Sequence, residues 1–208
     1  MTRVTIRTVA LSVGLVLVLA SLGTRLSAMR LPGNHQGYSP DQPIAYSHRL
    51  HAGELGIDCR YCHFAAAQSR HAGIPPAGTC MNCHKSVSAS RAAVLQEAEL
   101  AKAEGRDVVP VVSPELRKLY RALGLDDLRQ PDPKAKPHPI EWIQVHKLPD
   151  FVRFDHRSHV TADVACQSCH GPVETMERMR QHATLSMGWC VDCHRENKAT
   201  LDCGACHQ

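Results

Sequence analysis

The stretch that decides the fold is "FDHRSHVTADVACQSCH", residues 154–170, which places three histidines and two cysteines within seventeen residues. Apart from Phe154 and a few valines, it carries no large apolar side chain. A segment this poor in apolar residues cannot fold by burying its own side chains, since apolar burial is the main driving force of folding. Its imidazoles and thiols instead indicate that it folds around a group that the polypeptide does not supply.

Every cysteine of the chain belongs to the same short pattern, Cys-x-x-Cys-His, which is the pattern of covalent c-type haem attachment. In one helical turn, cysteines at i and i+3 share a face and can reach the two vinyl groups of one porphyrin. The histidine that follows can then bind the iron from below. We therefore predict five haems c, and the five signatures are Cys59/Cys62/His63, Cys80/Cys83/His84, Cys166/Cys169/His170, Cys190/Cys193/His194 and Cys203/Cys206/His207.

Three other uses of paired cysteines compete with haem attachment. An even number of cysteines fits disulfides in an oxidising compartment, and Cys-x-x-Cys pairs also occur in zinc sites and in thioredoxin-like redox sites. None of the three explains why a histidine follows every second cysteine. The haem interpretation explains both features.

The signatures belong to an internal repeat, a first unit at residues 46–84 and a second at 154–194. Each unit starts with an aromatic residue and two histidines, "YSHRLH" in the first and "FDHRSH" in the second. A signature follows after six or seven residues, and another about twenty residues later. The fifth signature, residues 203–207, is appended at the C-terminus.

Low-spin haems that carry electrons need a sixth iron ligand, usually His or Met. The repeat supplies four candidates, His48, His51, His156 and His159. By analogy with small class III cytochromes, His156 is expected to bind the haem of its own unit's first signature and His159 a neighbouring haem. For the fifth position we favour His146, and the alternatives are His182, His71, Met176, Met179 and Met187.

The N-terminus reads as an export signal. Arg3 and Arg7 precede an apolar run from Val9 to Leu22, which is the order of a secretory leader. Because no convincing cleavage site follows, we expect residues 1–30 to be retained as a single transmembrane signal-anchor helix in the inner membrane, with a cleaved leader as the alternative. Positive charge on the cytoplasmic side then places the haem domain, residues 31–208, on the periplasmic face.

Between the repeat units, residues 85–140 form an insert of different composition. Ser88 to Glu104 predicts one helix that ends at Gly105, and Ser113 followed by Pro114 predicts the start of a second helix towards Leu123. The stretch "QPDPKAKPHP", residues 130–139, is a proline-broken linker. No segment alternates as a strand does, so the expected fold is a class III-like multihaem cytochrome c, with short helices and loops wrapped around five haems and little or no sheet.

Composition excludes one class of partner. The net charge is only +4, and no basic stripe with interleaved aromatic residues is present, so nucleic acid binding is not expected.

Phe, Tyr and Trp together number nine in 208 residues, which is few for the hydrophobic core of a chain of this size.

Several motifs together resemble a known family, namely "AGIPPAGTCMNCHK", "SPELRKLY", "PIEWIQVHKLPDFVRFDHRSHV", "CQSCHGPVETM" and "SMGWCVDCHR". They are similar to the membrane-anchored pentahaem cytochrome c subunit of bacterial alternative complex III, a quinol:electron-acceptor oxidoreductase. The related multihaem subunit of the quinone reductase complex of sulfate reducers has six signatures, so the five signatures here favour the first complex. The resemblance implies three kinds of partner: a periplasmic iron–sulfur, molybdopterin-enzyme-like subunit, NrfD-like integral membrane subunits that bind quinol, and monohaem cytochrome c subunits.

The expected function is therefore non-catalytic electron transfer, from quinol oxidation along five haems to a periplasmic acceptor. One alternative is a stand-alone, membrane-anchored quinol dehydrogenase of the NapC type. A multihaem nitrogen-oxide enzyme is the other. It would need an open iron position, which a Cys-x-x-Cys-Lys variant often marks, and that variant does not occur in the sequence.

Overall fold

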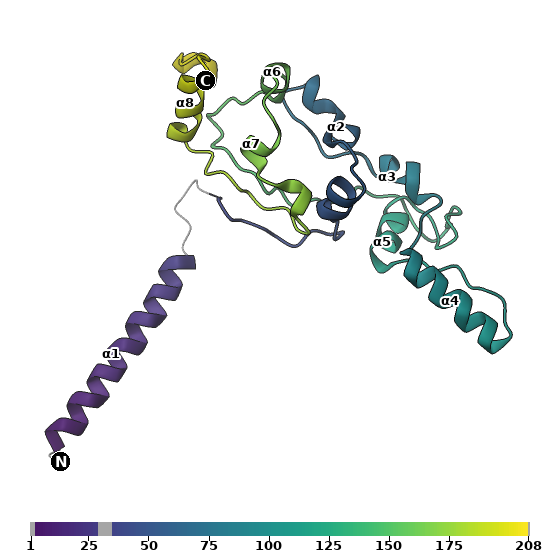
Figure 1. Cartoon of the computed structure of the whole chain (residues 1–208), viewed down its shortest axis with the longest axis horizontal. Helices are drawn as coiled ribbons and strands as arrows, with labels where there is room; N and C mark the ends of the chain where they lie inside the picture. Colours follow the sequence, from purple (N-terminus) through teal and green to yellow (C-terminus); the bar gives the residue numbers. More distant parts are fainter. Residues whose placement is uncertain (1–2, 29–34, 208) are drawn as a thin grey trace.

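The computed structural model describes residues 3–28 and 35–207. Figure 1 shows a long helix, α1, beside a body of short helices joined by long loops, and one helix, α4, that projects from the far side of that body. The elements in chain order are α1 (Arg3–Ala28), η1 (Arg49–Glu54), α2 (Cys59–Cys62), η2 (Phe64–Ala67), α3 (Ala77–His84), α4 (Arg91–Glu104), α5 (Pro114–Ala122), α6 (His156–Thr161), α7 (Gln167–His170), η3 (Val173–Thr175), α8 (Met187–Glu196) and α9 (Cys203–Cys206).

Strand structure in the described part of the chain amounts to two isolated bridges, Leu125 with Pro131 and Val152 with His207. The expectation of short helices and loops without a sheet is thereby confirmed. The second bridge ties the C-terminal signature to the chain that precedes α6.

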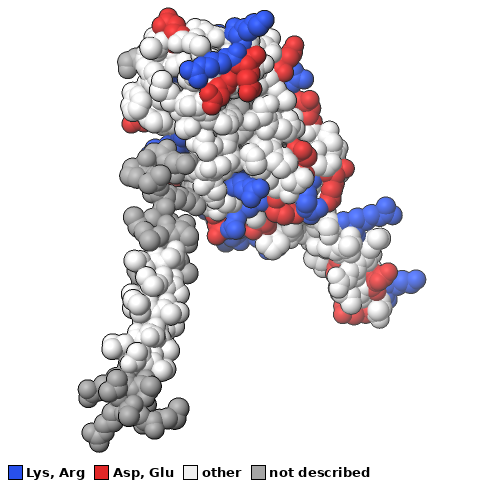
Figure 2. All heavy atoms as spheres, turned by 60° about the vertical axis from the view of Figure 1, so that its left-hand side comes forward, with Lys and Arg blue, Asp and Glu red and all other residues white. Residues whose placement is uncertain are grey.

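We expected residues 1–30 to form a transmembrane helix, and a helix does occupy Arg3–Ala28. Within the described residues, however, no helix combines the length and apolar character needed to cross a membrane. The apolar run from Val9 to Leu22 is shorter than the roughly 20 residues that span a bilayer. In Figure 2 the white surface of α1 contrasts with the charged surface of the body.

The two repeat units pack into each other. Helix η1 of the first unit contacts η3 of the second, and α6 of the second contacts η2 of the first. Backbone hydrogen bonds join both places, from Arg49 N to Met176 O at 2.9 Å and from His156 N to Arg70 O at 3.1 Å. Gly53 permits the first contact, because a Cβ there would lie 2.3 Å from Glu174 O.

A small apolar core lies where α3 meets α5. Ser113 caps α5 by accepting a hydrogen bond from Leu116 N, and Pro114 occupies the first turn, as the sequence predicted. On the inner face, Leu119 is 3% exposed and Tyr120 is fully buried. The Tyr120 hydroxyl donates to His84 O at 2.8 Å, so this core holds the signature at residues 80–84 in place.

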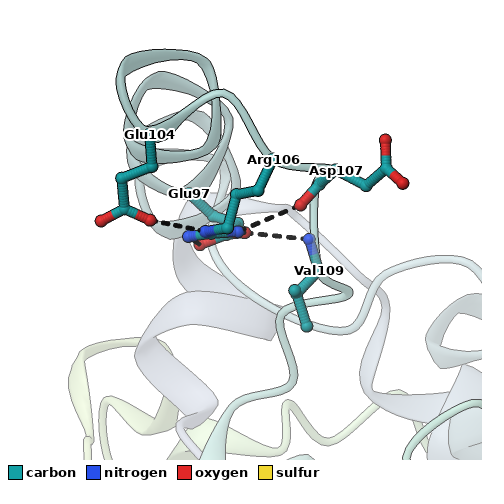
Figure 3. Close-up of polar contacts among 5 residues, drawn as sticks. All are labelled: Glu97, Glu104, Arg106, Asp107 and Val109. Carbon is teal, nitrogen blue, oxygen red and sulfur yellow. Dashed lines mark hydrogen bonds and ion pairs between the residues drawn. The ribbon is translucent and has the colours of Figure 1, made fainter.

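Helix α4 forms most of the projecting part of the insert (Figure 1). It starts at Arg91 rather than near Ser88, because Ser90 supplies the cap, and it ends at Gly105 with φ +65° as expected. The following loop is tied back to the helix by Arg106, which pairs with Glu97 and Glu104 at 2.6 Å each (Figure 3). Glu97 also accepts the hydrogen bond of the Val109 backbone N–H. Polar contacts therefore hold together the α4 arm, which consists of α4 and the loop that follows it to Val109.

Candidate haem-binding sites

Each Cys-x-x-Cys-His signature occupies a short helical turn, on α2, α3, α7, α8 or α9. All ten cysteines lie in the described part of the chain, and none of them forms a disulfide there. Side chains just before three of these turns accept backbone hydrogen bonds, Asp58 from Arg60 N, Ser186 from Trp189 N and Asp202 from Gly204 N. These caps show that local sequence fixes three of the five turns.

Six of the predicted iron ligands share one orientation, with Nδ1 hydrogen-bonded to a backbone carbonyl. A carbonyl can only accept, so Nδ1 carries the proton and Nε2 keeps its lone pair for a metal. The contacts are His51 to Ser47 O (2.9 Å), His63 to Gly73 O (2.6 Å), His84 to Val87 O (2.8 Å), His156 to Arg70 O (2.9 Å), His159 to Asp155 O (2.8 Å) and His194 to Thr200 O (2.7 Å).

Three pairs of histidine rings face each other at nearly equal spacing. The ring centres lie 6.1 Å apart for His51 and His84, 6.1 Å for His159 and His194, and 6.3 Å for His156 and His170. An iron bound on both sides, with metal–nitrogen bonds of about 2 Å and about 1 Å more to each ring centre, needs roughly 6 Å between the rings. The donor set and spacing of these pairs therefore fit a haem iron.

The aromatic residue at the start of each unit has the same place in both. Tyr46 stacks on His51 at 4.4 Å and meets His48 edge-on at 4.9 Å. Phe154 stacks on His159 at 4.5 Å and meets His156 edge-on at 4.8 Å. These rings hold the two histidines of each unit at a fixed angle to each other.

His48, the counterpart of His156, has a different environment. Burial lowers its pKa to about 4, with further lowering from the nearby His63 and His51. Its Nδ1 is buried and has no hydrogen-bond partner in the described part of the chain. His48 therefore lies neutral beside the signature at residues 59–63, as a ligand of that site would.

His146, expected as the fifth distal ligand, lies against His170. Its Nε2 is 3.1 Å from Nδ1 of His170, and the two ring centres are 4.4 Å apart. Burial lowers the pKa of both imidazoles to about 4, and the neighbouring histidines lower it further. The structure thus brings His146 to the signature at residues 166–170.

The fifth signature packs on the chain before α6. The ring of His207 stacks on Phe151 at 5.8 Å, and Arg153 N donates to Cys206 O at 2.7 Å. The alternatives for its distal ligand are spread over the body. His182 lies against Gly171, Met176 is buried and Met187 is exposed, and His71 is exposed and Met179 half-buried.

No motif of the sequence assigns a role to His35. The structure half-buries it, edge-on to Tyr38 at 5.2 Å. Its Nδ1 is buried without a hydrogen-bond partner among the described residues. Since no short motif surrounds His35 in the sequence, only the tertiary placement could reveal this.

Thiols of different signatures lie beside each other. Burial raises the pKa of Cys59, and the adjacent Cys166 thiol raises it further. Burial also raises the pKa of Cys62, with a contribution from Cys83, and that of Cys169, with contributions from Cys193 and Cys190. The pKa of Cys190 is raised by burial and then by Cys206. Each signature thus has at least one neighbouring signature.

Comparison with known proteins shows a similarity to cytochromes c. Residues 152–208 match the family described as cytochrome c7 and related cytochrome c. Over 194 residues, the chain is 23% identical to the "Menaquinone reductase, multiheme cytochrome c subunit" of Nitratidesulfovibrio vulgaris (strain Hildenborough). That alignment covers 81% of this chain and 77% of the relative.

The two matches support the general part of the expectation. The chain is related to multihaem cytochromes c, proteins that carry electrons, and one distant relative is a subunit of a quinone reductase complex. The family match covers the second repeat unit and the fifth signature, and the longer alignment extends over most of the chain.

Proposed function

We propose that this chain is the electron-transfer subunit of a membrane quinol:electron-acceptor oxidoreductase of the alternative complex III type. It would bind five haems c through its ten cysteines. Haem c, when bound, supplies reversible one-electron chemistry. The polypeptide would hold the irons in sequence, supply histidine nitrogens to them and limit their contact with water.

The observation that carries the proposal is the set of facing histidine pairs. In each unit the second upstream histidine faces the second signature, His51 with His84 and His159 with His194. In the second unit the first upstream histidine faces the first signature, His156 with His170. We assign His48 and His63 by the same rule, because His48 lies close enough to His63 to lower its pKa further after burial.

The neighbouring thiols support a single order of attachment sites. Cys83 is close enough to raise the pKa of Cys62, and Cys166 is close enough to raise that of Cys59. In the same way, Cys193 and Cys190 raise the pKa of Cys169, and Cys206 raises that of Cys190. The sites then follow one another as 80–84, 59–63, 166–170, 190–194 and 203–207. The helices α3, α2, α7 and α8 run in this order across Figure 1.

This order places one end of the haem chain at α3, beside the insert, and the other at the C-terminus. Histidine pairs at four of the five sites would leave no open position on their irons, and such an arrangement would move electrons without bond chemistry. We therefore propose that the subunit is non-catalytic. The quinol site would then belong to a partner. We propose NrfD-like membrane subunits for that role, with an iron–sulfur, molybdopterin-enzyme-like subunit and monohaem cytochromes c as the other partners.

The N-terminal sequence supports a proposal for the location of the haem domain. Arg3 and Arg7 before an apolar run are typical of an exported chain. We therefore place the haem domain on the periplasmic side of the inner membrane. Its position in the complex would keep it there through its partner subunits.

The test uses the full chain, made with haem-maturation enzymes and purified with its complex. Mass spectrometry is expected to show five haems on the polypeptide, and electron paramagnetic resonance to show that they are low-spin. Added quinol should reduce these haems in the complex but not in the isolated subunit.

Reduction of the isolated subunit by quinol would instead identify a stand-alone quinol dehydrogenase. Fewer than five covalent haems, or thiols that remain free, would refute the proposal itself. Cyanide or nitrite that shifts a large part of the haem spectrum would point to an open iron and an enzyme.

A further inference from the structure

We propose that His146 is a positioning residue for the haem attached at Cys166 and Cys169, whose Nε2 accepts the hydrogen bond of His170 Nδ1 and thereby sets the reduction potential of that haem. This inference rests on the proposed function. It replaces the expectation that His146 binds the fifth iron.

The geometry is that of a hydrogen bond between two imidazoles. The nitrogen–nitrogen distance is 3.1 Å, and the rings meet at 78° with centres 4.4 Å apart. The two nitrogens lie within hydrogen-bond distance. Because Nε2 of His170 is the nitrogen left for an iron, its Nδ1 would carry the proton and Nε2 of His146 would accept it. The same spacing leaves no room for an iron between the rings, which requires roughly 6 Å.

His170 differs in this contact from three other signature histidines. Nδ1 of His63, His84 and His194 is hydrogen-bonded to a backbone carbonyl. After His170 the chain turns away at Gly171, which has φ +72° and ψ −165°. The side chain of His146 takes the place that a carbonyl has at the other sites.

His146 is fixed in position by a buried polar residue. Gln181 is fully buried, and its Oε1 accepts the hydrogen bond of Lys147 N while its Nε2 donates to Ala183 O, both at 3.1 Å. Val145, on the other side of His146, is 8% exposed. A buried amide is costly unless its hydrogen bonds are made, so residues 145–147 are held tightly at the place where His146 meets His170.

The contact has a direct electronic effect on a bound iron. A histidine that donates its outer N–H to an acceptor becomes a more basic ligand. Greater basicity favours the ferric over the ferrous state, which lowers the reduction potential. Removal of the acceptor should therefore raise the potential of this one haem, and a tenfold change in a one-electron equilibrium corresponds to about 59 mV.

The experiment compares three variants of the haem-loaded full chain by potentiometric titration and electron paramagnetic resonance. His146→Leu removes the acceptor, whereas His146→Gln offers an amide oxygen in its place. His138→Leu is the control, because His138 is exposed in the linker between the repeat units. We expect His146→Leu to keep five low-spin haems and to raise one of five potentials, by up to about tenfold in its equilibrium (about 59 mV).

His146→Gln is expected to restore most of that shift, and His138→Leu to leave all five potentials unchanged. Two results overturn the inference. A haem that becomes high-spin in His146→Leu shows that His146 is an iron ligand, and five unchanged potentials show that the contact has no effect on the iron.

The glutamine variant decides the matter if His146→Leu does not fold. A high-spin haem in His146→Gln would identify an iron ligand, whereas five low-spin haems support the positioning role. A failure of the proposed function is seen separately, since the wild-type chain itself would then lack five haems.

Discussion

The two repeat units agree in one histidine pair and differ in the other. In the outer pairs, His51 with His84 and His159 with His194, the ring centres are 6.1 Å apart in both units. Each of these four histidines is oriented by a carbonyl of its own unit or of the loop that follows it. Local hydrogen bonds therefore orient the four rings of the outer pairs.

The inner pairs are His48 with His63 in the first unit and His156 with His170 in the second. Their surroundings include contacts between the two units or with the segment that joins them. His156 is oriented by Arg70 O of the first unit, whereas Nδ1 of its counterpart His48 is buried without a partner in the described residues. His170 is paired with His146, whereas its counterpart His63 bonds to Gly73 O. The same motif therefore forms two similar outer sites but two dissimilar inner sites in the two repeat units.

The largest spectral change is expected when the upstream histidine of each outer pair is replaced, which tests whether the two outer pairs are equivalent. His51→Ala and His159→Ala should each convert one haem from low-spin to high-spin, because each removes one axial ligand. Optical and electron paramagnetic resonance spectra measure the change. His138→Ala, at an exposed residue of the linker, is the control and should leave all spectra unaltered. Different outcomes for the two ligand variants would break the equivalence of the units.

A second test concerns the turn at Gly171, which directly follows His170 in the inner site of the second unit. Gly171 has φ +72°, and a Cβ there would lie 2.4 Å from His182 Cγ. Gly171→Ala is expected to lower the free energy of unfolding by about 1–3 kcal/mol, measured by denaturant titration. Gly188→Ala is the matched control, because a Cβ there meets nothing within 4 Å. Equal stability of the two variants would show that the turn is not strained by a side chain.

A third test compares the aromatic residues of the two units. Tyr46→Leu and Phe154→Leu each remove one stacked and one edge-on ring contact. Each should lower the free energy of unfolding by about 1 kcal/mol, the usual value of an aromatic pair. Thermal denaturation of the haem-loaded chain measures both losses. A loss confined to one unit would show that the aromatic residues are not equivalent.

The smallest effect is expected in the α4 arm, which lies outside both units. Arg106→Gln removes the ion pairs with Glu97 and Glu104 and should slightly lower the melting temperature without altering any haem spectrum. The hydrogen bond from Arg106 lowers the pKa of Glu97 from 4.5 to about 2. A carboxyl group whose pKa is lower in the folded than in the unfolded chain stabilises the fold at pH values above its unfolded-state pKa, and this stabilisation is lost as the pH falls through its folded-state pKa. The difference between wild type and variant should thus be constant above about pH 5 and vanish towards pH 2, and a difference that grows at low pH would contradict this.

Local features of the fold could be predicted from the sequence. The two helices of the insert are defined by short-range signals, a serine cap with Pro114 for α5 and Gly105 at the end of α4. The signatures and the upstream histidines carry their own spacing, so the members of the outer pairs can be identified from the repeat alone. The sequence also predicted a transmembrane helix at residues 1–30, whereas no helix of the described residues is long and apolar enough to cross a membrane.

Contacts between distant segments could not be predicted in this way. Nothing in the sequence indicates that Nε2 of His146 meets Nδ1 of His170, since this depends on how Gln181 holds Lys147. The burial of His35 is likewise a result of tertiary packing. Such contacts join segments whose separation in space is fixed by the whole fold and not by any motif.

The most direct test of the account is the set of iron–nitrogen bonds in an experimental structure of the haem-loaded chain. The account predicts that one iron joins His51 to His84, another His159 to His194, a third His156 to His170 and a fourth His48 to His63. An iron that joins His51 to His63, or His159 to His170, would contradict it.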